Sequence, residues 1–274
     1  MPSYDSSRMR LRLADRHIAV LATLLEGETP SEELWPSLVE MQQVGLVGQE
    51  GELAPLLAPL LGALADPVLM VQVEVTGEHG TLHHGVIVGQ DVAYVHDGWP
   101  GQEESEYVPV ETNVLVWELS RLVNLHSIDE PESKVERIET TLGVLDAGFQ
   151  ALEGSAGGDE ASEAAVRSAL TGAGLAEPQL TELVALILAM NSMWRITTAW
   201  NGEHEGEQAA MVRALAAWDC GPHGSWVREK PAEPVLDGQV GPDSELVLVR
   251  TPSRAIWEKI TELLPDKADF YVRD

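Results

Sequence analysis

The chain has 274 residues, and its 45 acidic against 17 basic residues give a formal net charge of −28. This charge repels phosphate backbones and anionic lipid heads, so it argues against nucleic acid and membrane surfaces as partners. The hydrophobic fraction of 44% is typical of a folded globular protein, and the length suits one large domain or two modest ones.

Cysteine usage and the start of the chain indicate the compartment. The one cysteine, Cys220, allows no intrachain disulfide. No apolar run approaches the roughly 20 residues that span a bilayer, and Met1–Asp5 lacks the apolar core of a secretion signal. We therefore expect a cytoplasmic protein.

The first hundred residues change from a helical to an extended pattern. Residues 11–65 carry apolar side chains at helical spacing, which predicts three helices. Pro59 would kink the third helix if that helix runs through it. The pattern then alternates between apolar and polar residues, which predicts strands at 68–76, 82–88 and 92–95 in an antiparallel meander.

A polar loop from Asp97 to Ser105 follows the meander and leads to a predicted strand at 107–110. Pro109 has no N–H to give to a ladder, so we expect an edge strand or a strand end there. Asn113 can cap a helix at 114–125, which completes the first half.

A break between two halves is predicted at 129–158. An acidic, proline-containing start precedes a predicted helix at 133–152 and a flexible Gly/Ser-rich stretch at 154–158. The chain is thereby divided into a helix–meander–helix half at 1–128, a connecting helix and linker at 129–158, and a second helix–meander–helix half at 159–274.

The second half repeats features of the first in the same order. Gly45-Leu46, a helix and a strand ending in Gly77-Glu78-His79 are echoed by Gly174-Leu175, a helix and a strand ending in Gly202-Glu203-His204. Both halves also close with a strand, a threonine and a helix that carries Trp-Glu. We therefore predict an internally duplicated α+β fold, whose units join into one sheet with a helical layer or bundle at each end.

Two histidine clusters were considered as metal sites. His79, His83 and His84 lie near a turn beside Glu78. On a strand His83 and His84 point to opposite faces, so they do not converge on one ion. The cluster around His204 is interpreted as a turn, and we expect no metal.

Catalytic groups are sparse. Cys220 beside Asp219 and near His223 could pair a nucleophile with a base, but no orienting third group or motif accompanies them. A cysteine at a strand end more often packs as a small apolar residue. Nucleophile elbows, phosphate loops, zinc helices and dinucleotide fingerprints are all missing from the sequence. We expect no enzyme, no catalytic residue and no cofactor.

Tryptophan supplies the candidate binding residues, since the chain has eight tryptophans and two phenylalanines. Tryptophan is favoured at interfaces because one rigid side chain buries a large area and keeps a donor. Trp99 in a loop, Trp200 at a strand end and Trp226 between polar residues are the candidates for partner binding, with burial in the core as the alternative for each. The remaining five are expected in the core: Trp35, Trp117, Trp194, Trp218 and Trp257.

Four stretches share a pattern of apolar spacing, glycine and tryptophan: "VGLVGQEGELAPLLAPLLGALADP", "GLAEPQLTELVALILAM", "MVRALAAWDCGPHGSWVRE" and "LVLVRTPSRAIWEKITELL". In these stretches, which span most of its length, the chain resembles the EspG family, the cytosolic chaperones of actinobacterial type VII (ESX) secretion. The resemblance implies a pseudo-twofold fold with a central antiparallel sheet flanked by two helical bundles. It also implies binding to the tip of a secreted helical client, PE/PPE-like or WXG-type.

The family recognises such clients by the sheet face, a loop between two strands and the C-terminal bundle. The corresponding connection here, Gly89–Asp91, is too short to reach a client, so the Asp97–Ser105 loop with Trp99 is the substitute. The resemblance thus suggests a chaperone, a monomer or weak dimer, that keeps an aggregation-prone helical-hairpin protein soluble. The alternatives are an enzyme or small-ligand binder with a cleft between the halves, and a homo-oligomer that uses exposed sheet edges.

Overall fold

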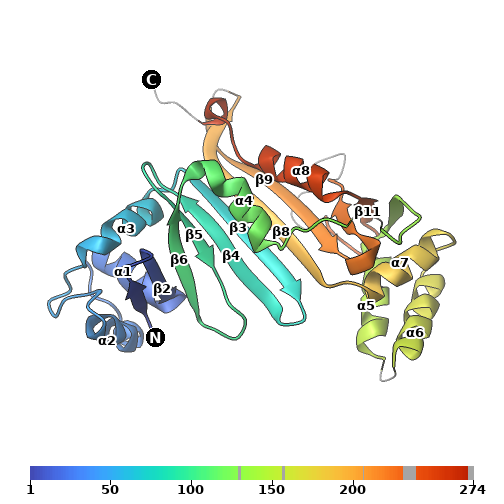
Figure 1. Ribbon diagram of the computed structural model, residues 1–274, viewed down its shortest axis with the longest axis horizontal. Helices are drawn as coiled ribbons and strands as arrows, with labels where there is room; N and C mark the ends of the chain where they lie inside the picture. Colours follow the sequence, from blue (N-terminus) through green and yellow to red (C-terminus); the bar gives the residue numbers. More distant parts are fainter. Residues whose placement is uncertain (129–130, 156–157, 206, 231–238, 271–274) are drawn as a thin grey trace. The chain divides into compact units, whose positions relative to one another are not determined.

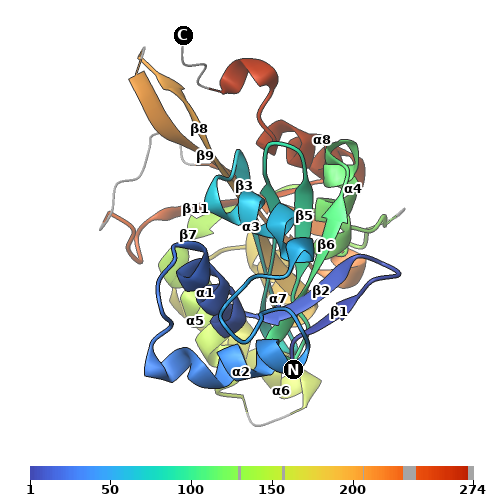
Figure 2. The same cartoon turned by 90° about the vertical axis from the view of Figure 1, so that its left-hand side faces the viewer.

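The computed structural model describes residues 1–128, 131–155, 158–205, 207–230 and 239–270. Eleven strands form one sheet in the order β1-β2-β6-β5-β4-β3-β8-β9-β10-β11-β7 (Figures 1 and 2). The strand pairs whose register is defined are antiparallel. This confirms the predicted mixture of helices with a large antiparallel sheet.

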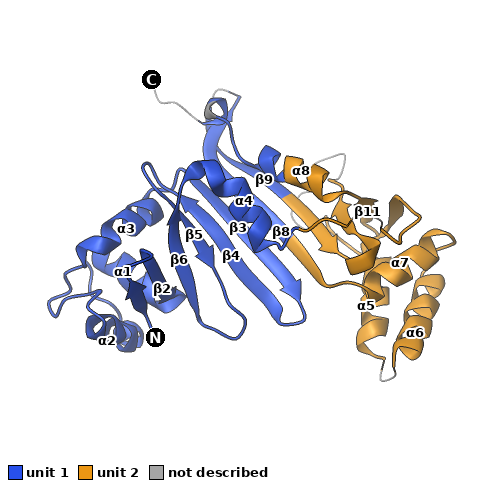
Figure 3. Ribbon diagram, in the orientation of Figure 1, with its two compact units in different colours: residues 1–125, 195–214, 260–274 blue, residues 126–194, 215–259 orange. Residues whose placement is uncertain are grey.

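The chain divides into two compact units (Figure 3). Unit 1 comprises residues 1–125, 195–214 and 260–274, and unit 2 comprises 126–194 and 215–259. The units differ from the contiguous halves predicted from sequence, because β8 (Ser192–His204), β9 (Glu207–Asp219) and α8 (Ser253–Leu263) each contribute residues to both. Of the predicted flexible stretch at 154–158, positions 156 and 157 lie outside the described residues.

Among the described residues, unit 1 contains four complete helices and six complete strands, together with parts of β8, β9 and α8. Its elements are β1 (Ser3–Asp5), β2 (Arg10–Ala14), α1 (Asp15–Leu25), α2 (Trp35–Gln43), α3 (Ala58–Ala65), β3 (Leu69–Gly77), β4 (Gly80–Val88), β5 (Ala93–Asp97), β6 (Glu104–Val110) and α4 (Leu115–Leu122). Short 3₁₀ turns precede α2, α3 and α4, and another spans Lys267–Asp269.

Unit 2 consists of three helices and three further strands, together with its parts of β8, β9 and α8. These are β7 (Arg137–Thr141), α5 (Leu142–Glu153), α6 (Asp159–Gly172), α7 (Gln179–Leu188), β10 (Ser225–Arg228) and β11 (Glu245–Arg250). A 3₁₀ turn at Gly221–His223 joins β9 to β10.

Two predicted helical segments are strands instead. β2 occupies the start of the first predicted helix, and its burial alternates, with Leu11 and Leu13 buried and Arg12 partly exposed. β7 replaces the first part of the helix predicted at 133–152, and only Ile138 among its residues is fully buried. Sheet pairing with β6 and β11, respectively, overrides the local helical pattern.

The two prolines behave as their backbone chemistry dictates. α3 begins at Ala58, so Pro59 lies in the first turn, where no N–H is needed, and the helix is not interrupted. β2 pairs with β6 only from Glu104 to Tyr107, so Pro109 lies beyond that ladder, as the predicted strand end requires.

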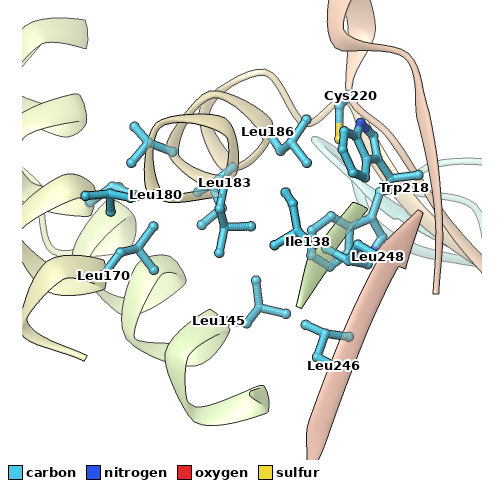
Figure 4. Close-up of a cluster of buried hydrophobic side chains, with 14 residues drawn as sticks. Ile138, Leu145, Leu170, Leu180, Leu183, Leu186, Trp218, Cys220, Leu246 and Leu248 are labelled. Atoms are coloured by element: carbon cyan, nitrogen blue, oxygen red, sulfur yellow. The ribbon is translucent and has the colours of Figure 1, made fainter. Parts of the chain in front are cut away.

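Unit 2 has its core between its helices and one face of its strands (Figure 4). α7 is buried on several sides, with Leu183 and Leu186 at 0% exposure. Gly148 of α5 permits close packing, because a Cβ there would lie 2.7 Å from Cδ1 of Ile187. Truncating one such buried leucine to alanine costs about 2–5 kcal/mol.

Unit 1 has a separate core under its helices. Tyr94 and Tyr107 on the strands pack with leucines of α1, α3 and β2. In Figure 2, α1 lies on the left of these strands and α4 on the right, so helices of unit 1 lie on both faces of β5 and β6. No helix among the described residues combines the length and apolar character needed to cross a membrane.

Candidate partner-binding surface

Two of the three candidate tryptophans are buried. Trp226 of β10 has 0% exposure, and its Nε1 donates to the carbonyl of His223 at 3.3 Å. Trp200 of β8 has 5% exposure, and its Nε1 donates to the carbonyl of Asp269 at 3.1 Å. Each indole ring is buried, and each indole N–H is hydrogen-bonded within the chain. The expectation that these two tryptophans bind another protein does not fit this burial.

Trp99 is the candidate that remains on the surface, with 49% exposure in the loop between β5 and β6. The base of this loop is held in place. His84 Nδ1 lies 2.9 Å from Asp97 Oδ1, and Arg121 Nη1 donates to Asp97 Oδ2 at 2.8 Å. Burial raises the pKa of Asp97, but hydrogen bonds with His84 and Arg121 outweigh it and hold the pKa below its ordinary value.

Two tryptophans predicted in the core are exposed instead, Trp35 at 53% and Trp117 at 67%. α4 buries Leu115 and Leu119, one helical turn apart. Trp117 lies two residues from each, about 200° around the helix axis from Leu115, so it points away from the core. The core assignment is therefore wrong for these two and correct for Trp194 and Trp218, at 4% and 6% exposure.

One face of β3, β8 and β9 in unit 1 carries an uncovered row of side chains. On β8, Thr198 Oγ1 donates to the carbonyl of Leu263 at 2.9 Å, so the even-numbered residues face the end of α8. The odd-numbered residues, and the even-numbered ones of β9, therefore point to the other side. We call the following residues the outer row: Met70, Gln72, Glu74, Thr197, Ala199, Ala210, Val212 and Ala214.

The position of Met70 follows from the strand register. Met70 pairs with Ile87 of β4, which pairs with Tyr94 of β5. Tyr94 packs under the N-terminal helices, so Met70 lies on that side of the sheet but beyond the cover of the helices. Met70 is 52% exposed, and Val212 is 61% exposed.

The composition of the outer row is unusual for a solvated strand face. Along a strand with one face in water, every second residue faces the water and is normally charged or polar. Here β9 presents Ala210, Val212 and Ala214, and β8 presents Thr197 and Ala199. Small side chains at these positions leave the backbone of β8 and β9 open to close approach. The sequence did not single out this row, because alternation along a strand does not show which face the helices leave uncovered.

The histidine cluster near the β3–β4 turn is split by the sheet. His83 pairs with Glu74 and is exposed, whereas His84 pairs with Val73 and is buried at 7% exposure. The opposite orientation of the two rings agrees with the prediction from strand geometry. Among the described residues no three histidine, cysteine or acidic side chains are grouped as a metal site.

Cys220 is buried at 0% exposure behind β9. Burial, together with the charges of Asp219 and Glu182, raises the pKa of its thiol to about 12. A thiol with this pKa is protonated at neutral pH and is a poor nucleophile. The Asp219 carboxylate accepts a hydrogen bond from the Gly221 N–H at 3.0 Å.

Unit 2 also holds a cavity of about 390 Å³ beside the start of α8. Arg250 lines this cavity, and its guanidinium donates to the carbonyl of Ser133 at 3.2 Å and to the carboxylate of Glu136 at 3.4 Å. His126 also lines the cavity, and its Nε2 lies 3.9 Å from Asp219 Oδ1. Each of these two side chains already has a contact within the protein, so the cavity does not favour a second function.

Comparison with known proteins reveals similarity of structure. No protein-family model matches the sequence, and no curated protein matches it. The structure of the Mycobacterium tuberculosis type VII secretion system chaperone EspG5 in complex with a PE25–PPE41 dimer matches with a TM-score of 0.56 at 12% identity. The match covers 96% of this chain and 100% of the matched chain. The chain has an EspG-like fold.

The EspG-like fold supports the coarse part of the family resemblance. At 12% identity the similarity establishes the arrangement of elements and not the roles of individual residues. The residues of the candidate surface must therefore be argued from this chain's own exposure and chemistry.

Proposed function

We propose that the chain is a non-enzymatic, cytoplasmic chaperone of a type VII secretion system. It binds a secreted helical-hairpin client, PE/PPE-like or WXG-type, through the outer row. The observation that carries this proposal is the outer row, in which five of the eight side chains are apolar, on an uncovered part of the sheet of an EspG-like fold, in a chain with a net charge of −28. The apolar row provides adhesion, and the surrounding charge keeps the unbound protein soluble.

The size of the surface sets a condition on the client. A stable complex buries about 800 Å² on each partner. Met70 and Val212 alone do not supply this area, so the client must extend over β3, β8 and β9. The tip of a two-helix hairpin satisfies its own backbone hydrogen bonds, and it can therefore lie on a sheet face without adding a strand.

We further propose that the fold arose by duplication. The order β2-α1-α2-α3-β3-β4-β5-β6-α4 recurs as β7-α5-α6-α7-β8-β9-β10-β11-α8. The strand order from β2 to β7 is symmetric about the β3–β8 neighbours. These two regularities support the predicted pseudo-twofold arrangement.

The sheet edges favour a chaperone monomer over a self-assembling protein. β1 has three residues and β7 has five. On β7, Arg137 pairs with Glu139 at 2.7 Å and with Glu229 at 2.8 Å. Short, charged edge strands disfavour pairing with a second copy.

Co-expression with the small helical-hairpin proteins encoded beside this chain tests the proposal. Light scattering of the purified material should give a complex of defined mass, and a client that is insoluble alone should become soluble. A well-folded chain that leaves every such neighbour insoluble would contradict the chaperone proposal. Mass that rises with the concentration of the chain alone would indicate self-assembly instead.

A further inference from the structure

We infer that a groove beside Trp99 binds a partner segment in which a carboxylate stands next to an apolar side chain. The groove measures about 280 Å³ and is lined by Arg12, Trp99, Pro100, Gln102 and Glu106. We call it the Trp99 groove. This inference concerns a different surface from the outer row and does not depend on the proposed chaperone function.

The apolar part of the Trp99 groove is the exposed indole beside Pro100. Exposed tryptophans that border a cavity act as anchors at interfaces, because their large rigid surface loses little entropy on binding. The loop that carries Trp99 is already ordered at its base. A Cβ at Gly98 would lie 2.6 Å from the carbonyl of His83, so the backbone there packs directly against β4. This preorganisation lowers the entropic cost of binding.

The charged part is Arg12, whose guanidinium forms no ion pair among the described residues, although its charge also acts on the nearby Glu104 carboxylate. Its Nη2 donates to the neutral Oε1 of Gln102 at 2.6 Å. Its Nε is buried and has no hydrogen-bond partner among the described residues. Glu106 is the cross-strand neighbour of Arg12, but its carboxylate accepts from Arg10 at 2.8 Å instead.

The chemistry of the occupant follows from this arrangement. An arginine without an ion-pair partner favours a carboxylate, because a hydrogen bond between two charged groups is stronger than one between neutral groups. The adjacent indole and proline favour an apolar side chain next to that carboxylate. The net charge of −28 would repel an acidic segment at long range. At physiological salt, however, the Debye length is about 8 Å, so the charges that line the groove matter most, and of these Glu106 is paired with Arg10 whereas Arg12 has no ion pair among the described residues.

Two short peptides test the inference on the full chain labelled with ¹⁵N. The probes are acetyl-Ala-Leu-Asp-Ala-amide and the same peptide with Asn in place of Asp. The indole N–H signal of Trp99 is assigned by its loss in Trp99→Phe. We expect the Asp peptide to shift this signal and to bind at least about threefold more tightly than the Asn peptide.

Two variants test whether Arg12 causes the preference for the Asp peptide over the Asn peptide. Arg12→Gln should abolish the difference between the peptides, and Arg254→Gln, which removes an exposed guanidinium on α8, should preserve it. An unmoved Trp99 signal, equal affinities for the two peptides, or a preference that survives Arg12→Gln would overturn the inference. The comparison of two peptides on the unmodified chain needs no variant, so it decides the matter even if Arg12→Gln fails to fold.

Discussion

Arg213 lies over the indole of Trp200, with its guanidinium carbon 4.8 Å from the ring centre. The same guanidinium donates to the carbonyls of Glu262 at 3.1 Å and Leu264 at 3.2 Å, and to Asp269 Oδ2 at 3.0 Å. These carbonyls close the end of α8, where a cation also complements the helix dipole. Arg213 of β9 and Trp200 of β8 therefore hold the end of α8 and the segment that follows it against these two strands. This contact explains why Trp200 is buried.

Arg213→Ala should lower the free energy of unfolding by about 1–2 kcal/mol, because it removes charge-assisted hydrogen bonds to two carbonyls at the end of α8, one exposed and one partly buried. Arg213→Lys should recover part of this loss, since it retains the charge without the fork of donors. Urea denaturation measures both. Arg195→Ala, at an exposed position of β8, is the control and should change stability by less than about 0.5 kcal/mol. Equal effects of Arg213→Ala and Arg195→Ala would contradict the capping role.

The echoed glycines Gly45 and Gly174 end α2 and α6 in the same way. Their φ angles are 75° and 94°, and the next residues, Leu46 and Leu175, each donate at 3.0 Å to the carbonyl five positions earlier. A side chain is disfavoured at such angles, and no atom lies within 4 Å of a Cβ built at either glycine. Alanine at each position should therefore lower stability by about 1–2 kcal/mol through backbone strain alone.

Gly62→Ala is the matched control for these glycines. Gly62 lies inside α3 with no atom within 4 Å of a built Cβ, and its φ angle is negative. Alanine there should raise stability by about 0.5–1 kcal/mol. Thermal unfolding of the three variants distinguishes the cases, and a gain in stability from Gly45→Ala or Gly174→Ala would refute the capping interpretation.

His17 should make stability fall on acidification. Its Nδ1 accepts from the Ala14 N–H at 2.9 Å and its Nε2 lies 2.9 Å from Glu40, so the folded ring is the neutral tautomer with hydrogen on Nε2. Burial lowers the pKa of His17 below its ordinary value of 6.5, despite the opposing effect of Glu40. The unfolded chain then binds the proton more readily, and stability is lost as pH falls from 6.5 through the folded pKa.

The measurement is the unfolding free energy between pH 7.5 and pH 5 for the wild type, His17→Gln and, as control, His79→Gln. The slope with pH should flatten in His17→Gln only, since glutamine does not titrate. His79 lies in the exposed β3–β4 turn, so its replacement should leave the slope unchanged. An identical slope in all three proteins would count against the role of His17.

Cys220 should resist thiol reagents in the folded protein, because burial raises its pKa to about 12. Reaction with a chromogenic disulfide at pH 8 should be negligible over an hour without denaturant and complete in urea. Rapid stoichiometric labelling of the native chain would show instead that Cys220 is accessible, and it would revive the catalytic interpretation.

The sequence was informative where one physical signal dominated. The alternation of apolar and polar residues around Val71, Val73 and Val75 predicted β3, and the repeat of the first half predicted the helix that follows Gly174-Leu175, which is α7. β2 and β7 were missed because both are short strands near the ends of the sheet, in segments whose apolar residues also fit a helix. Their identity depends on pairing with β6 and β11, distant partners that no local pattern reveals.

The candidate surface was only partly predictable. The exposure of Trp99 followed from its polar loop, whereas the burial of Trp226 depends on the helices that cover β10. The exposure of Trp117 could have been read from the spacing of Leu115 and Leu119. The outer row required the structure, because alternation shows that two faces exist but not which one the helices leave uncovered.

The most direct test of the proposed client surface compares Val212→Glu with Val240→Glu in the co-expressed complex. The two valines are similarly exposed, at 61% and 60%, but Val240 lies outside the outer row. A carboxylate at position 212 would be buried unpaired against the apolar client, so we predict at least about tenfold weaker binding. Val240→Glu should bind as the wild type does. Wild-type affinity in Val212→Glu, or equal losses in both variants, would contradict the assignment of the outer row as the client surface.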